Sequence, residues 1–350
     1  MAMGSMTRRS LFGTLGVGAL SLAACGGGSS EGGDAGDETI RIEMITDTGG
    51  VNDQSFNQLA WAGLERMRDE KGYEVSYMES KQDSDYMTNL DKAVDDECAV
   101  IWGIGYAMTE AINMAAEQNP DMTFGSIEGT ETNNDNLTCV LFKSQEPSFV
   151  AGYIAASMSE KGKVGFIGGM ESETIQAFEY GYYAGVEYAN KQNGTSVTYQ
   201  GQYAESFGDA AKGKSIAQKM IKDGCDVMFH AAGGTGVGML EACNDAGVWC
   251  IGVDQDQAAL FPDYTTIITS VLKRVDNAIV SVTEDLIAGK GVGEMLVLGA
   301  EQDAVGLADT HDLIPDGVYE PAIALFDSIK AGEIEVPDTK DKLDAFVKTL

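Results

Sequence analysis

The order of apolar strands and amphipathic helices in this 350-residue chain occurs twice. Residues 40–128 run strand, helix, strand, helix, strand, helix, strand, and residues 163–254 repeat that order. Apolar strands that alternate with helices predict a parallel sheet with helices on both faces. Two such units in tandem therefore predict an α/β fold with two doubly wound parallel-sheet lobes joined by a hinge.

The repeat can be followed element by element. The expected strands are 41–45, 74–78, 99–104 and 123–127 in the first unit, and 163–167, 196–203, 226–230 and 248–253 in the second. Helical periods predict helices over 56–70, 86–95 and 109–118, then over 173–190, 207–222 and 236–246. Gly63 and Gly185 take matching places in the first helices, and Glu128 and Asp254 each end a fourth strand.

The chain is expected to pass between the lobes more than once, near residues 143–147 and 265–272. Lobe 1 then comprises residues 39–145 plus about 270–292. Lobe 2 comprises residues 146–269 plus about 293–350, although the packing of residues 290–350 is not fixed by their pattern.

The first 38 residues predict export and a membrane anchor. Arg8 and Arg9 precede a short apolar stretch, and Leu-Ala-Ala before Cys25 is similar to a bacterial lipoprotein cleavage site. We therefore expect residues 1–24 to be a signal peptide, with Sec and twin-arginine export both open. Residues 25–38 are expected to be a lipid-modified cysteine and a flexible tether, because they are rich in Gly, Ser, Asp and Glu.

The charge of the chain argues against a nucleic-acid partner, and its cysteine content argues against a metal site. The chain has 55 acidic and 23 basic residues, a net charge of −32. Such a surface repels nucleic acid, so no nucleic-acid partner is expected. Besides Cys25 there are five cysteines, an odd number without Cys-x-x-Cys spacing, and only two histidines. We expect buried core cysteines and neither a metal site nor a cofactor.

Residues 47–57 read Asp-Thr-Gly-Gly-Val-Asn-Asp-Gln-Ser-Phe-Asn and follow the first strand. The two glycines let the backbone turn sharply and bring its N–H groups close to a ligand. Carboxylates, carboxamides, hydroxyls and one ring together suit a polar small molecule that contains a ring. The alternative is a turn whose Asp and Asn only cap the next helix.

In open parallel sheets the ligand lies beyond the carboxyl ends of the strands. If the two lobes face each other, Asp47, Glu128, Phe207, the 233–234 glycines and Asp254 converge on one cleft. This arrangement indicates capture of a solute by hinge closure.

The chain resembles the basic membrane protein family of ABC-transporter substrate-binding lipoproteins, whose better understood members bind purine nucleosides. The resemblance covers residue 40 to about 338. It rests on eight segments in order: 47–57, 149–155, 165–169, 178–185, 206–209, 233–236, 252–257 and 269–273. It implies a type I periplasmic-binding-protein fold, a lipid-anchored protein on the extracytoplasmic face of the cell membrane, permease and ATPase partners, and no enzymatic activity.

The resemblance also implies the ligand-binding residues, which are Asp47, Phe56, Asn57, Glu128, Phe207, Gly234, Asp254 and Lys273. Phe56 and Phe207 would sandwich the base, at about 1–3 kcal/mol per stacked base. The ribose hydroxyls would be held by Asp47, Asp254, Lys273 and a backbone N–H near Gly234. Asn57 and Glu128 would bind the edge of the base. The family usually has Asp where this chain has Glu128, so the preferred base stays open.

Other interpretations stay open from the residues alone. The solute could be a sugar or a carbohydrate-like signal, with the binding role unchanged. A nucleoside hydrolase would use an Asp-rich turn to hold calcium, but Asp47 and Asp53 lack the paired aspartates that would complete the ligand set. Phe56 and Phe207 could be core residues, Asp254 a turn cap, and Lys273 part of a solvated surface.

Overall fold

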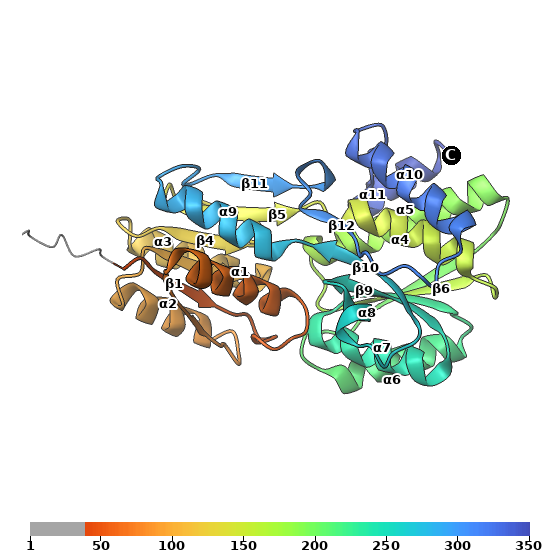
Figure 1. The fold of residues 1–350 in the computed structure, drawn as a ribbon, viewed down its shortest axis with the longest axis horizontal. Helices are drawn as coiled ribbons and strands as arrows, with labels where there is room; N and C mark the ends of the chain where they lie inside the picture. The colour runs from red at the N-terminus through yellow and green to blue at the C-terminus, as the bar shows by residue number, and fades with distance from the viewer. Residues whose placement is uncertain (1–38) are drawn as a thin grey trace, which may run out of the picture. The chain divides into compact units, whose positions relative to one another are not determined.

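The computed structural model describes residues 39–350, which contain two six-stranded sheets (Figure 1). These residues belong to one compact unit. The predicted signal peptide, the lipidation site Cys25 and the tether lie outside the described residues. The two parallel-dominated sheets with alternating helices confirm the predicted doubly wound lobes.

The first sheet has the order β11-β5-β4-β3-β1-β2, and all its pairs are parallel. Its strands are β1 (Arg41–Ile45), β2 (Glu74–Met78), β3 (Val100–Ile104), β4 (Phe124–Ile127), β5 (Leu137–Phe142) and β11 (Met295–Leu298). Helices α1 (Phe56–Lys71) and α9 (Val275–Ile287) pack side by side, as Figure 1 shows. They share one core with Ile42 and Met44, whereas α2 (Asp85–Asp95) and α3 (Thr109–Gln118) share another with Ile45 and Ile101.

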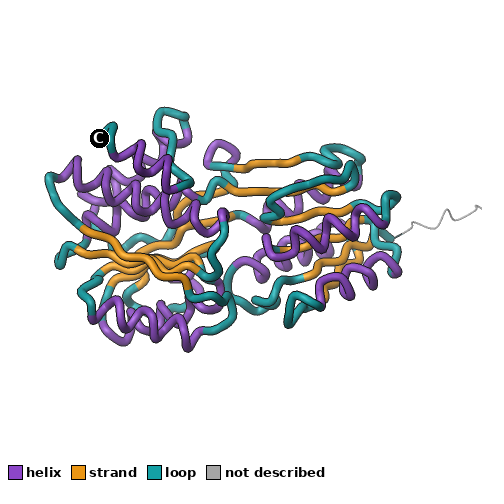
Figure 2. Tube along the Cα trace, turned by 180° about the vertical axis from the view of Figure 1, so that it is seen from behind, coloured by secondary structure: helices purple, strands orange, loops and turns teal. Residues whose placement is uncertain are grey.

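The second sheet has the order β12-β10-β9-β8-β6-β7, and only β12 is antiparallel to its neighbour. Its strands are β6 (Lys163–Gly168), β7 (Thr198–Tyr203), β8 (Val227–Ala231), β9 (Trp249–Asp254), β10 (Ile267–Lys273) and β12 (Val305–Leu307). Its helices are α4 (Gln145–Met158), α5 (Glu173–Asn193), α6 (Ala210–Lys222), α7 (Gly233–Ala246), α8 (Gln257–Leu260), α10 (Asp316–Lys330) and α11 (Lys340–Val347). Figure 2 shows helices on both sides of these strands.

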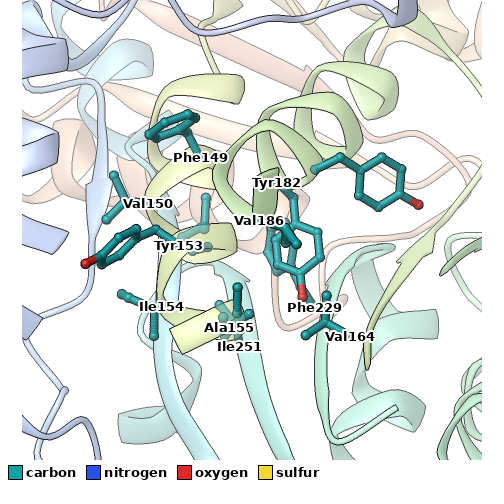
Figure 3. Packing of buried hydrophobic residues seen from close by; sticks show 14 of the residues in the cluster. Phe149, Val150, Tyr153, Ile154, Ala155, Val164, Tyr182, Val186, Phe229 and Ile251 are labelled. Carbon is teal, nitrogen blue, oxygen red and sulfur yellow. The ribbon is translucent and has the colours of Figure 1, made fainter. Parts of the chain in front are cut away.

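The larger core of the second lobe lies between β6, β8 and β9 and the helix pair α4 and α5 (Figure 3). Phe229 and Tyr182 place their ring centroids 5.3 Å apart within it. The two helices approach closely because Gly185 has no side chain: a Cβ there would lie 1.9 Å from the Phe149 carbonyl oxygen. Gly63 does the same for α1 and α9, since its Cβ would lie 2.7 Å from the Asp276 carbonyl oxygen. The matching glycines therefore serve helix packing in both lobes.

The chain crosses between the lobes three times, from β5 to α4, from β10 to α9 and from β11 to β12. β10 runs to Lys273 in the second sheet, so the second crossing comes after the predicted residues 265–272. β11 pairs with β5, so residues 295–298 belong to the first sheet and not to lobe 2 as predicted. The reason is apolar packing, because Leu296 and Leu298 contact the first-lobe core.

The start of α6 also differs from the predicted one. α6 begins at Ala210 and not at residue 207, because the Asp209 side chain accepts a hydrogen bond from the Lys212 N–H and caps the helix. Phe207 therefore stands in the loop before α6. All five cysteines of the described residues are buried, as predicted.

Candidate ligand-binding site

One pocket is lined by residues from both lobes, at the carboxyl ends of the central strands. It holds about 530 Å³ of empty space, including the part that opens to solvent. Among its lining residues are Asp47, Phe56, Asn57, Glu128, Phe207, Asp254 and Lys273. Of the predicted glycine pair, Gly233 lines the pocket, and Gly234 lies behind it against the Phe207 carbonyl oxygen.

Residues 46–55, here called the site loop, join β1 to α1 and are organised by Asp53. Its Oδ1 accepts hydrogen bonds from the N–H groups of Ser55 and Gln58, at 2.9 and 3.1 Å. Its Oδ2 accepts from the Asn57 N–H at 2.8 Å and from Asn57 Nδ2 at 3.0 Å. The capping explanation is therefore right for Asp53, whose oxygens satisfy the first turn of α1.

Asp47 is placed differently from Asp53. Its Oδ1 accepts from the Gly49 N–H and from Asn57 Nδ2, both at 2.9 Å. Its Oδ2 lies against Gly105, where a Cβ would approach within 2.7 Å. Burial raises the pKa of Asp47 to about 6, against the hydrogen bonds that lower it. The carboxylate therefore keeps one oxygen free of the site loop.

Asn57 joins the two aspartates through its amide nitrogen. Because Nδ2 donates to both Asp47 and Asp53, only Oδ1 is left for another partner. Within residues 39–350 this buried oxygen has no hydrogen-bond donor. Asn57 can therefore offer a ligand an acceptor and no donor.

A buried ion pair connects the lobes across the pocket. Lys273 Nζ, at the end of β10, lies 2.7 Å from Glu128 Oε1, and each side chain is only 4% exposed. Thr174, on α5, donates to Glu128 Oε2 at 3.2 Å. The interpretation of Lys273 as a solvated surface residue is therefore wrong.

Three rings surround the Lys273 ammonium as well. Its nitrogen lies 4.7 Å from the ring centre of Phe178, 5.3 Å from that of Phe56 and 5.6 Å from that of Phe142. Cations at such distances are attracted by the ring faces. Phe56 therefore both lines the pocket and makes a cation–π contact with Lys273.

Asp254 makes a second contact between the lobes, because its Oδ2 accepts a hydrogen bond from the Ser55 hydroxyl of the site loop. Burial raises the pKa of Asp254 to about 6, and nearby Asp53 and Glu128 act in the same direction. Lys273 and the Ser55 hydroxyl oppose this rise. Glu128 and Asp254 thus both interact with the positive charge of Lys273.

Phe56 and Phe207 come from different lobes and line the same pocket. Each is half-buried and packs against the core of its own lobe. The Phe207 ring lies over Gly169, where a Cβ would come within 2.2 Å of Cε1. Tyr106 meets Phe207 nearly edge-on, with ring centroids 6.3 Å apart and an interplanar angle of 72°.

Several pocket residues carried no signal in the sequence. Tyr106 lies in the turn after β3, and Thr174 lies in the first turn of α5. Both positions follow the carboxyl end of a strand, which is the edge where a parallel sheet binds ligands. Position in the fold could have indicated them, whereas their residue types could not.

Comparison with known proteins identifies the family. Residues 40–340 match the Bmp family, described as ABC transporter substrate-binding protein PnrA-like. The chain belongs to the Bmp family. Basic membrane protein A of Borreliella burgdorferi is 36% identical over 323 residues, which cover 90% of this chain and 93% of that protein. The CD4+ T-cell-stimulating antigen of Listeria innocua is 38% identical over 340 residues, covering 91% and 94%.

Solved structures agree with this Bmp assignment. A solute-binding protein of an ABC transporter system from Aeropyrum pernix K1 superposes with a TM-score of 0.79 at 28% identity, covering 88% of this chain and 96% of that one. The predicted family and type I periplasmic-binding-protein fold are confirmed. This Bmp protein is an ABC transporter substrate-binding protein, a class that works with permease and ATPase subunits.

Two features are absent from residues 39–350 of this Bmp protein. No helix in that range combines the length and the apolar character needed to cross a membrane. No group of three or more His, Cys, Asp or Glu residues in that range could hold a metal ion.

Proposed function

We propose that this Bmp protein captures a purine nucleoside between its lobes for an ABC importer. The observation that carries the proposal is the pair Phe56 and Phe207, which reach one pocket from opposite lobes beside Asp47, Asp254 and Lys273. A flat base fits between rings, because every base has a face that stacks on an aromatic side chain. Carboxylates suit the ribose, since each can accept hydrogen bonds from neighbouring hydroxyls.

Contact with both lobes supplies the driving force for capture. A ligand shifts a conformational equilibrium only by its difference in affinity for the two states. A base held by one ring from each lobe makes its full contacts only when the lobes are closed. Stacking is worth about 1–3 kcal/mol per base, so the rings favour the closed form substantially.

The proposal is tested by titrating the purified protein with inosine, guanosine, adenosine, uridine and free ribose in a calorimeter. We expect a purine nucleoside to bind far more tightly than ribose. Phe56→Ala and Phe207→Ala should each weaken that binding at least fivefold, the equivalent of about 1 kcal/mol of stacking. Phe261→Ala, which removes a ring outside the pocket, should leave affinity unchanged.

Binding of ribose as tight as that of the nucleosides would favour a sugar ligand instead. Mass spectrometry of the ligand that copurifies under non-denaturing conditions would then name the solute. It would also identify the base, which Glu128 leaves open.

We further propose that a lipid on Cys25 holds the protein at the extracytoplasmic face of the membrane. The Leu-Ala-Ala sequence before Cys25 supports this proposal. Labelled palmitate should enter the wild-type protein, and Cys25→Ser should abolish the label and release the protein from the membrane fraction. Unchanged labelling in Cys25→Ser would contradict the proposal.

A further inference from the structure

Gln257 makes a contact between the lobes that does not involve a pocket side chain. It is the first residue of α8 in the second lobe, and it is completely buried. Its Nε2 donates a hydrogen bond of 3.3 Å to the backbone oxygen of Gln54 in the site loop. A buried side chain of the second lobe thus holds the backbone of the first.

The orientation of the Gln257 amide is fixed by its neighbours. The Val253 N–H lies 3.0 Å from Oε1, and a backbone N–H can only donate, so that atom is the oxygen. His230 Nε2 lies 3.0 Å from the same oxygen and must therefore carry the hydrogen. With Oε1 accepting both bonds, Nε2 of Gln257 is directed to Gln54.

The His230 ring makes no other hydrogen bond with residues 39–350. It is completely buried on β8, and burial lowers its pKa to about 4, so the ring is neutral at pH 7. Its Nδ1 has no partner within residues 39–350. The ring lies against Gly236, where a Cβ would come within 1.9 Å of Nδ1. Among residues 39–350, the hydrogen bond to Gln257 is therefore the only one that the His230 side chain makes.

Gln54, which accepts the hydrogen bond from Gln257, has a strained backbone conformation. Gln54 has a φ of 55°, in the left-handed region that residues other than glycine seldom adopt. The next residue, Ser55, donates to Asp254 of the second lobe. Two consecutive residues are thus held from across the pocket, directly before Phe56. Strained backbone of this kind persists where surrounding contacts determine it.

We propose that Gln257 is a positioning residue that couples closure of the lobes to the shape of the site loop, and that His230 holds its amide in the required orientation. When the lobes separate, the Gln54 carbonyl loses its donor and the site loop relaxes. When they close, the loop returns to the shape that places Asp47 and Phe56 in the pocket. This coupling is independent of which solute the pocket binds.

The His230 side chain allows a matched pair of variants. In His230→Gln the amide nitrogen can take the place of Nε2 and still donate to Gln257. In His230→Asn the shorter side chain places its nitrogen near the position of Nδ1, so that donor is lost. Gln257→Glu keeps the shape of the side chain but replaces the donor to Gln54 with an oxygen.

The test is hydrogen–deuterium exchange of peptides spanning residues 46–57 in the purified full-length protein, without added ligand. We expect His230→Asn and Gln257→Glu to speed exchange of these peptides at least fivefold, and His230→Gln to stay within twofold of wild type. Peptides from α2, in the same lobe but away from the contact, should exchange at wild-type rates. Equal exchange in His230→Asn and His230→Gln would overturn the proposal.

Stopped-flow measurement with whichever solute the calorimeter identifies provides a second readout. The dissociation rate should rise at least fivefold in His230→Asn, with an association rate within twofold of wild type. Failure of nucleosides to bind would contradict the proposed function alone, because the exchange experiment needs no ligand. Should Gln257→Glu fail to fold, the His230 pair decides.

Discussion

Glu128 and Asp254 have the same left-handed backbone at the same place in the two lobes, with φ values of 64° and 67°. Glu128 follows β4 and Asp254 ends β9, the fourth strand of each unit. Residues other than glycine seldom adopt this conformation, and where they do they cluster at ligand sites. The internal repeat therefore extends from the order of elements to the backbone conformation of two pocket acids.

Replacing Lys273 should destabilise the protein strongly. Lys273→Met removes one partner of a buried ion pair and leaves the Glu128 carboxylate without its cation, which typically costs about 3–5 kcal/mol. Urea denaturation measures the change in the free energy of unfolding. Lys214→Met is the matched control, because Lys214 pairs with Glu241 and Asp245 near the surface, where such pairs are worth about 1 kcal/mol or less. Equal losses in both variants would contradict the prediction.

Ligand affinity should fall in mild acid. Asp47 and Asp254 both have a pKa raised to about 6, chiefly by burial. Below pH 6 each carboxylate gains a proton and loses acceptor capacity for the ribose hydroxyls of the proposed nucleoside. Calorimetric titration of the nucleoside at pH 7.5 and pH 5 should show weaker binding at pH 5. Affinity that rises or stays constant over this interval would show that neither carboxylate binds the ligand in its ionised form.

The raised pKa of Asp47 should make the folded protein more stable in mild acid, although ligand affinity falls there. The folded pKa of Asp47, about 6, lies above the ordinary 3.8, so folded protein binds more protons between these values. Its contribution favours folding below pH 3.8 and is lost as pH rises through 6. Asp47→Asn removes this dependence. The free energy of unfolding of the variant, minus that of the wild type, should therefore fall by about 1.4 kcal/mol when the pH is lowered from 7 to 5. Urea denaturation at the two pH values measures this difference.

Displacing the Phe207 ring should weaken binding without unfolding the protein. A Cβ at Gly169 would lie 2.2 Å from Phe207 Cε1, so Gly169→Ala forces the ring to move. We expect at least fivefold weaker nucleoside binding, from a loss of about 1 kcal/mol of stacking. Gly306→Ala is the control, because no atom lies within 4 Å of its Cβ position. Wild-type affinity in Gly169→Ala would show that this ring does not contact the base.

Helix packing should depend on Gly185. Its Cβ would lie 1.9 Å from the Phe149 carbonyl oxygen, so Gly185→Ala must push α4 and α5 apart. Overpacking of this kind costs about 1–3 kcal/mol, which thermal unfolding detects. Gly317→Ala, in α10 with open space around it, should hold or raise the melting temperature. Similar losses in both variants would mean that helix separation is not the cause.

The fold could be predicted from the sequence because its units are local and repeated. β1 and β2 coincide with their predicted ranges. β11 could not be placed, because four apolar residues fit the edge of either sheet and only Leu296 and Leu298 in the first core decide it. The start of α6 was placed too early, because the periodic pattern does not show the Asp209 cap.

The site was only partly accessible from the sequence. The pocket acids and rings follow strand ends, so topology alone places them together. The partners of each side chain could not be predicted in the same way. Nothing in the sequence shows that the Asn57 amide nitrogen donates to two aspartates, or that the Lys273 ammonium lies among three aromatic rings. These are pairings between distant segments, which only the packed structure fixes.

The three crossings between the sheets decide how the protein can be divided. A recombinant fragment that stops near residue 143 would lack α9 and the edge strand β11, and its first sheet would expose an unpaired β5. Such an edge invites aggregation. Neither half can therefore be expressed as one continuous piece, and a split reporter built on this scaffold would need its break in a surface turn within a lobe.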